Sequence, residues 1–171
     1  ATDAEDDPLT YKVSGTEFAI SSSGVLTFVA APDFETKASY TATVTVNDGV
    51  NDTTQVITVS VTNVNDIAPV ISSSATFSAA ENQTAIGTVT ATDSDGDSVT
   101  FTVSGSELEI TSAGVLTFAS APDFETKSTY TATVSASNGT NATTQAITVN
   151  VTDVDEAPVF TSSATFSAAE N

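Results

Sequence analysis

Apolar and polar residues alternate with a period of two wherever the chain is regular. In residues 41–46, for example, Thr alternates with Ala and Val. No stretch keeps an apolar stripe at the 3.6-residue helical period, so the pattern predicts an all-β chain. Within residues 67–156 the alternation predicts seven strands, at 76–79, 85–91, 98–104, 107–110, 115–118, 129–137 and 144–151.

Turn residues separate these strands at short intervals. Asp95-Gly96 precedes the third strand, Gly114 the fifth and Asn138-Gly139 the seventh. Asn-Gly favours a hairpin because both residues readily adopt positive φ. Seven short strands in one domain-sized segment predict a two-sheet immunoglobulin-like β-sandwich. The predicted core comprises Phe101, Val103, Leu108, Ile110, Val115, Leu116, Phe118, Tyr130, Val134, Ile147, Val149 and Val151.

The sequence repeats itself with a domain-sized period. Residues 31–37 and 121–127 both read APDFETK, and residues 73–82 and 162–171 both read SSATFSAAEN. A period of about 90 residues suits a whole small domain rather than a solenoid turn. We therefore expect tandem repeats: a partial repeat lacking its first strands at 1–66, a complete repeat at 67–156, and the first strand of a following repeat at 157–171.

The net charge of the chain limits the kinds of partner that it can bind. There are 22 Asp and Glu against 3 Lys and Arg, a formal net charge of −19, which excludes electrostatic binding to nucleic acid or to an anionic membrane and favours cations. Cys and His are absent from the sequence, which removes thiolate sites and the usual nitrogen ligands of zinc. No apolar run approaches the 18 residues of a spanning helix.

Acidic residues gather in a few segments while most strand positions are neutral. Such clusters repel one another unless a cation binds them. Oxygen ligands without Cys or His favour calcium, whereas magnesium prefers few protein ligands and retained waters. The alternative, a solvated acidic surface of a salt-adapted protein, does not explain the clustering.

An EF-hand loop does not account for this chemistry. Asp93, Asp95 and Asp97 imitate its first positions, but Ser98 replaces the required Gly and Ser104 the bidentate Glu.

Four motifs in a fixed order resemble those of the cadherin repeat. They are AAEN at 79–82, ATDSD at 91–95, PDFE at 32–35 and 122–125, and NVNDIAP or DVDEAP at 63–69 and 153–158. The resemblance covers essentially the whole chain, and it implies a cadherin-like Greek-key sandwich with calcium at the junction between consecutive domains. At the complete junction the implied ligands are Asp33, Glu35, Asn65, Asp66, Asp93, Asp95 and Asn138. Half-sites are implied at the chain ends, from Asp3, Glu5, Asp48, Glu81, Asp123, Glu125, Asp155 and Glu156. Asn63 and Asn138 replace acids of the family pattern, which predicts fewer ions or weaker binding.

The resemblance implies a structural role outside the cell. We expect an extender region of a large bacterial (RTX-type) surface adhesin, whose adjacent repeats are stiffened by calcium and project a distal ligand-binding region. A direct adhesive module, homophilic or carbohydrate-binding, is the alternative, although Trp is absent and most Tyr and Phe fall at core-like positions. An ice-binding surface is disfavoured because each Thr row is short.

Catalysis is not expected. Asp33 and Glu35 recur at 123 and 125, as a structural ion site would, whereas a glycosidase pair needs differently perturbed environments in a cleft.

The two incomplete ends predict contact between molecules. Residues 157–171 supply an opening strand without its domain, and residues 1–66 lack their opening strands, so the tail of one copy is expected to dock head-to-tail on another.

Overall fold

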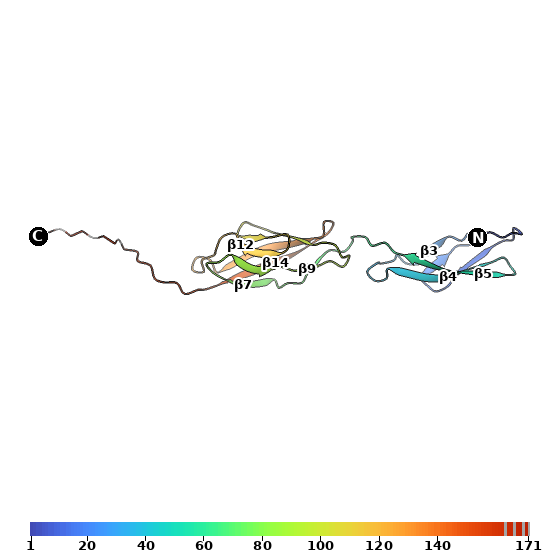
Figure 1. Ribbon diagram of the computed structural model, residues 1–171, viewed down its shortest axis with the longest axis horizontal. Helices are drawn as coiled ribbons and strands as arrows, with labels where there is room; N and C mark the ends of the chain where they lie inside the picture. Colours follow the sequence, from blue (N-terminus) through green and yellow to red (C-terminus); the bar gives the residue numbers. More distant parts are fainter. Residues whose placement is uncertain (163, 166, 169, 171) are drawn as a thin grey trace. The chain divides into compact units, whose positions relative to one another are not determined.

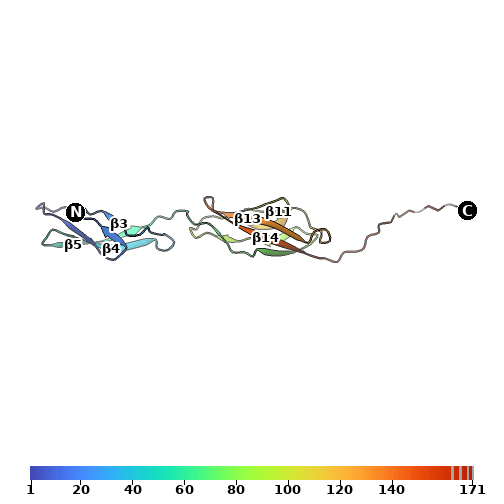
Figure 2. The same ribbon diagram turned by 180° about the vertical axis from the view of Figure 1, so that it is seen from behind.

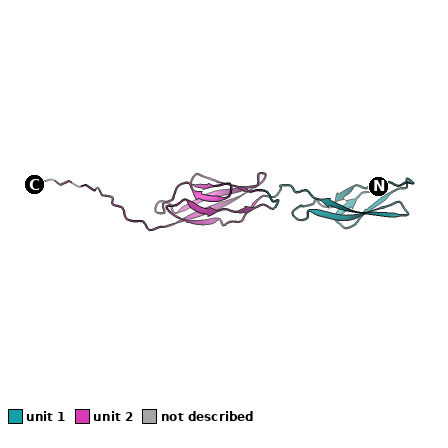
Figure 3. Cartoon of the chain, viewed as in Figure 1, with its two compact units in different colours: residues 1–67, 94–97 teal, residues 68–93, 98–171 magenta. Residues whose placement is uncertain are grey.

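The structure, a computed structural model, describes residues 1–162, 164–165, 167–168 and 170. These residues form strands and no helix, which confirms the all-β prediction. The chain divides into two compact units (Figure 3): unit 1 comprises residues 1–67 and 94–97, and unit 2 comprises 68–93 and 98–171. No described segment is a helix of the length and apolarity that crossing a membrane requires.

Unit 2 is a sandwich of two antiparallel-rich sheets. Its strands are β6 (Val70–Ile71), β7 (Thr76–Ala80), β8 (Ala85–Thr88), β9 (Ala91–Thr92), β10 (Thr100–Val103), β11 (Leu108–Ile110), β12 (Val115–Phe118), β13 (Thr129–Ser137) and β14 (Ala142–Thr152). One sheet has the order β10-β13-β14-β7 and the other β11-β12-β8, and β6 and β9 form a separate short pair. Figure 2 shows β13 and β14 side by side, as their nine-pair register requires.

The first long strand of unit 2 lies beside its last. β7 pairs with β14 in parallel, from Thr76 opposite Thr148 to Ala80 opposite Thr152 (Figure 1). The other pairings of this sheet are antiparallel. The last strand is therefore hydrogen-bonded on both sides, and β7 closes the edge of the sheet.

The core of unit 2 agrees with the core predicted from the alternation, except at Val115. Leu116 and Phe118 are buried, whereas Val115, predicted as core, is 45% exposed. Successive strand residues point to opposite faces, so neighbouring Val115 and Leu116 cannot both face inward. Val103, Ile110 and Tyr130 are partly buried around the core, and the remaining predicted core residues are buried. Val89, Ala79 and Ala136 complete the core and were not predicted.

The predicted strand at 85–91 is two strands. β8 pairs with β12 in one sheet, and β9 pairs with β6. Between them the Val89 amide donates to the Gly114 carbonyl at 2.8 Å, and the Thr90 carbonyl accepts from the Ser72 amide at 2.9 Å. The chain thus changes partner at Val89–Thr90. Two-residue strands such as β6 carry no alternation, which is why β6 was not predicted.

Unit 1 repeats part of this arrangement. Its strands are β1 (Thr10–Val13), β2 (Phe18–Ile20), β3 (Leu26–Phe28), β4 (Ser39–Asn47) and β5 (Asp52–Ser60), in sheets of order β1-β4-β5 and β2-β3. Thr41 lies opposite Thr58, as Thr131 lies opposite Thr148 in unit 2. The described residues of unit 1 contain no counterpart of β7 or β8.

Without those strands the core of unit 1 is open along β5. Phe18 and Ala42 are the fully buried apolar residues of its described part. Ile57 and Val59 are only partly buried, whereas their counterparts Ile147 and Val149 in unit 2 are 2% and 0% exposed.

The described residues after Thr152 form no strand. Val159 and Phe160 are 84% and 95% exposed there. Residues 163, 166, 169 and 171 of the predicted tail strand lie outside the described residues, and the assignment of 157–171 to a following repeat stays a prediction.

Candidate metal centre

Glu81 is the buried carboxylate of unit 2. It follows directly after β7 and is only 3% exposed. Its Oε2 accepts a hydrogen bond from the Phe124 amide at 2.7 Å, and its Oε1 accepts from the Val154 amide at 2.8 Å. The neighbouring Asn82 has a φ of 61° and its side-chain amide donates to Glu156 at 2.7 Å. Glu81 thus joins the end of β7, the PDFE loop and the segment that leaves β14.

Two further carboxylates surround Glu81. Ligand oxygens of Glu81, Glu125 and Asp153 all lie within 4.8 Å of one another. The backbone amide of Glu125 lowers the pKa of that carboxyl, but desolvation and the charges of Glu81, Glu156 and Asp153 together outweigh it and raise the pKa. Three carboxylates at this distance form an all-oxygen donor set, which fits a hard divalent cation such as calcium.

Asp153 was not among the predicted ligands, although DVDEAP begins with it. Its sequence counterpart in NVNDIAP is Asn63. Comparison of the two motifs therefore shows an acid at the first position of DVDEAP where NVNDIAP has Asn. Only the fold shows that this acid, rather than Asp155, lies beside Glu81 and Glu125.

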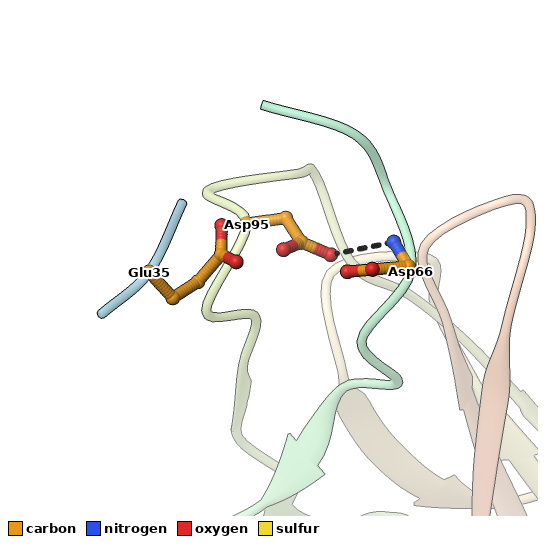
Figure 4. Close-up of side chains that lie close together, drawn as sticks. All are labelled: Glu35, Asp66 and Asp95. Atoms are coloured by element: carbon orange, nitrogen blue, oxygen red, sulfur yellow. Dashed lines mark hydrogen bonds between the residues drawn. The ribbon is translucent and has the colours of Figure 1, made fainter. Parts of the chain in front are cut away.

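A second carboxylate group lies within unit 1. Figure 4 shows Glu35 directed toward Asp95, with Asp66 on the other side of Asp95. Their ligand oxygens lie within 4.8 Å of one another. Desolvation, followed by the hydrogen bond and the charge of Asp95, raises the pKa of Glu35 above its usual value.

Backbone amides fix Asp95 in this group. Its Oδ2 accepts from the Asp66 amide at 3.1 Å and from the Ile67 amide at 2.9 Å. The Asn63 side-chain amide donates to the Asp95 carbonyl at 2.8 Å. At Asn63, the replacement of an acid by an amide thus provides a hydrogen-bond donor to the loop that carries Asp95.

Asp33 and Asp123 cap turns in the repeated PDFE motif. The carboxylate of Asp33 accepts from the Thr36 hydroxyl at 2.9 Å and amide at 3.1 Å. The Thr36 hydroxyl and then its amide lower the pKa of Asp33. Asp123 has the same two bonds to Thr126, each at 3.0 Å. These two acids stabilise their loops and are not members of the carboxylate groups described above.

The Asn138 side chain connects a turn to Asp93. Its Oδ1 accepts from the amides of Thr140 and Asn141 at 3.0 and 2.7 Å, and its Nδ2 donates to Asp93 at 3.0 Å. The corresponding Asp48 accepts from the Val50 and Asn51 amides at 2.7 and 2.6 Å. The Asn51 amide and then the Val50 amide lower the pKa of Asp48.

The other predicted ligands lie outside the two carboxylate groups described above. Asp3 accepts from the amides of Glu5 and Asp7 at 2.9 and 3.2 Å, and Glu5 is exposed. Asn65 is partly buried, and Asp155 is exposed. For these residues, and for Asp33, Asp48, Asp93, Asp123, Asn138 and Glu156, ion binding stays a prediction.

Comparison with known proteins gives the family. The family model described as "Bacterial Ig domain" matches residues 65–152, just over half of the chain and most of unit 2. The chain belongs to the bacterial Ig domain family.

A curated relative of this bacterial Ig domain chain is the "Chitinase A" of Pseudoalteromonas piscicida. It is 32% identical over 163 residues, which are 94% of the present chain but 20% of the relative. The chain therefore spans about a fifth of the relative's length.

Solved cadherin structures share the fold of this bacterial Ig domain chain. The protocadherin gammaB7 EC3-6 structure aligns with a TM-score of 0.75 and 26% identity, over 88% of the present chain and 43% of that chain. Human protocadherin-24 EC1-2 aligns with a TM-score of 0.73 and 22% identity, over 90% and 85% of the two chains. These findings confirm the predicted immunoglobulin-like and cadherin-like β-sandwich, a fold of non-enzymatic type.

Proposed function

We propose that the chain is part of a calcium-stiffened extender of a bacterial surface adhesin, of the RTX type, exposed outside the cell. The membership in the bacterial Ig domain family and the cadherin-like fold support a structural module in a longer protein. In this role the domains act as spacers that carry a distal binding region. Adjacent repeats of the same chain are the expected partners.

The observation that carries the proposal is the setting of Glu81. A buried carboxylate is costly unless its charge is compensated. The amides of Phe124 and Val154 compensate it in part, but Glu125 and Asp153 add two negative charges beside it. A divalent cation converts this repulsion into attraction, and calcium accepts such a set of carboxylate oxygens.

The same geometry supports a mechanism by which a bound calcium ion would act on the domain. Glu81 ends β7, Glu125 lies in the PDFE loop and Asp153 follows β14. An ion held by all three ties the segment that leaves the domain to two other parts of its end. The direction in which the chain leaves unit 2 is then fixed, and bending there is suppressed.

A calcium titration followed by thermal unfolding tests ion binding. Calcium at about 100 times its Kd is expected to stabilise unit 2 by about 2.7 kcal/mol, and a chelator to remove the effect. Asp153→Asn places the residue of the sister motif at the site and is expected to weaken calcium binding, whereas Glu109→Gln on the exposed face of β11 should leave it unchanged. An unchanged melting temperature of the unaltered chain in calcium would contradict the proposal.

Stiffening of the chain by calcium requires a separate measurement. Small-angle scattering should show a narrower distribution of dimensions with calcium than with chelator, because clustered carboxylates repel when no ion is bound. Equal profiles in the two conditions would exclude the extender mechanism even if calcium binds.

A direct adhesive module, carbohydrate-binding or homophilic, is the second candidate. The specific observation in favour of carbohydrate binding is the relative named chitinase, which shares this segment at 32% identity. Sedimentation with insoluble chitin and cellulose tests it. Retention of the chain on either polymer, abolished by soluble oligosaccharide, would favour this function over the extender.

A further inference from the structure

The neighbours of the Asn138 side chain allow only one orientation of its amide. Its Oδ1 accepts from the amides of Thr140 and Asn141 at 3.0 and 2.7 Å, and its Nδ2 donates to the Asp93 carboxylate at 3.0 Å. The reversed amide would turn Nδ2 toward two N–H donors and Oδ1 toward a carboxylate, and neither contact is a hydrogen bond. A hydrogen-bond donor of Asn138 therefore faces Asp93.

This orientation does not fit the calcium ligand that the sequence predicts at Asn138. Calcium binds oxygen atoms, and the one side-chain oxygen of Asn138 already accepts from two backbone amides. The N–H group that faces Asp93 brings a partial positive charge to the carboxylate, as a cation would. The amide thus takes the place of an ion beside Asp93.

The corresponding turn of unit 1 has an acid at this position. Asp48 is the counterpart of Asn138, and its Oδ1 accepts from the amides of Val50 and Asn51 at 2.7 and 2.6 Å. Its Oδ2 accepts from the Asn51 side-chain amide at 3.2 Å. The turn therefore accommodates Asp and Asn with the same backbone bonds, and the two residues differ in whether the second side-chain atom accepts or donates.

Asn63 shows the same use of an amide in unit 1. Its side chain donates to the Asp95 carbonyl at 2.8 Å. Its counterpart in the sister motif is Asp153, which lies beside Glu81 and Glu125. At two positions, therefore, an acid of one repeat is replaced in the other by an amide that donates a hydrogen bond.

We propose that Asn138 replaces a metal ion at its end of unit 2 and makes that end independent of calcium. Its bonds join Asp93, which directly follows β9, to the turn between β13 and β14. Asp153, in the Glu81 group, follows the other end of β14. Withdrawal of calcium is then expected to loosen the end that carries Glu81 and to leave the Asn138 end closed. This inference goes beyond the proposed function, which concerns the Glu81 group.

Asn138→Asp tests the replacement. Asp fits this turn in unit 1, but here its carboxylate would face that of Asp93 and repel it. In chelator we expect unit 2 of the variant to melt about 4–8 °C below that of the unaltered chain, the shift that one lost hydrogen bond causes in a domain of this size. Calcium should recover this loss, because an ion between two carboxylates turns repulsion into attraction.

Thr140→Asp is the matched control for added charge. It places one more acid in the same turn, at an exposed position that does not face Asp93 through the bond described above. Calcium should therefore raise the melting temperature of this variant no more than that of the unaltered chain. An equal gain in Thr140→Asp and Asn138→Asp would show that the position of the charge does not matter and would contradict the proposal.

Two further variants separate this role from a general loss of packing. Asn138→Ala removes the bonds and should lower the melting temperature by the same amount with and without calcium. The exchanged pair, Asp93→Asn with Asn138→Asp, again sets a donor against an acceptor, so its stability should need no more calcium than that of the unaltered chain. A loss in Asn138→Asp that calcium does not recover, or an exchanged pair that behaves like Asn138→Asp alone, would overturn the proposal.

NMR of the unaltered chain during a calcium titration reports on both ends of unit 2. The side-chain amide signals of Asn138 should keep their positions, while the backbone amides of Phe124 and Val154, which donate to Glu81, should shift. Movement of the Asn138 side-chain signals with calcium would show that this residue is an ion ligand and would overturn the inference. Unchanged Phe124 and Val154 signals would instead contradict the proposed function, and calcium dependence gained in Asn138→Asp would still support the inference.

Discussion

Glu81 combines two tasks that usually fall to different residues. It satisfies two part-buried backbone amides of unit 2, and it brings a negative charge beside Glu125 and Asp153. The hydrogen bonds hold the carboxylate in place before any ion binds. Such preorganisation lowers the cost of binding, because the ligand does not have to be ordered by the ion.

Replacement of Glu81 by Ala is therefore expected to destabilise unit 2 even without calcium. Two part-buried amides lose their acceptors, which lowers the free energy of unfolding by about 2 kcal/mol. Denaturant unfolding in chelator measures this change. Glu109→Ala on the exposed face of β11 is the control, and an equal effect of both substitutions would show that Glu81 has no special structural role.

At the scale of elements, one glycine permits a close backbone approach where the chain passes from β8 to β9. Gly114 has a φ of +87°, and a Cβ there would lie 2.2 Å from the Val89 carbonyl oxygen. Gly105 has a similar φ of +84° but open space around it. At Gly24, the counterpart of Gly114 in unit 1, the three nearest atoms to a Cβ belong to the Tyr11 ring, at 3.1 Å and beyond, and none is a backbone atom.

Gly105 and Gly114 permit a matched pair of substitutions. Gly105→Ala is expected to cost about 1–2 kcal/mol from backbone strain alone. Gly114→Ala should cost about 2 kcal/mol more, because the Val89 backbone must also move. Unfolding followed by circular dichroism would rank the variants, and equal losses at 105 and 114 would contradict the close approach seen in the structure.

Alternation predicted most elements because it reports which face of a strand is buried. It placed β13 and β10–β12 correctly to within two residues, but it missed β6 and the break between β8 and β9, where pairing depends on distant strands. The prediction that Val115 is buried was wrong, because two adjacent strand residues cannot both face the core. Clustering of acids in the sequence predicted cation chemistry, and the resemblance to cadherin repeats implied that Glu35, Asp66 and Asp95 come together. The capping bonds of Asp33 and the place of Asp153 depend on the folded loops.

At the scale of the whole molecule, the two units differ in how completely their cores are covered. Most fully buried apolar residues of the described chain, including Leu116, Val134 and Val149, belong to unit 2. Their counterparts in unit 1 are partly exposed, so burial stabilises unit 1 less.

Unit 1 is accordingly expected to unfold first on heating. In a dilute sample with chelator, hydrogen exchange of β4 should be faster than that of β13, although both strands pair over nine residues. Local stability follows from buried contacts more than from backbone pairing alone. A single cooperative transition with equal exchange in both strands would contradict this expectation.

The parallel pairing of β7 with β14 bears on how unit 2 responds to tension. Pulling on the chain that enters β7 and on the chain that leaves β14 draws two parallel neighbours in opposite directions along their lengths. The load then falls on all the pairs from Thr76–Thr148 to Ala80–Thr152 at once, rather than on one pair after another as in a zipper. A domain closed in this way is expected to resist extension until all of these pairs break together.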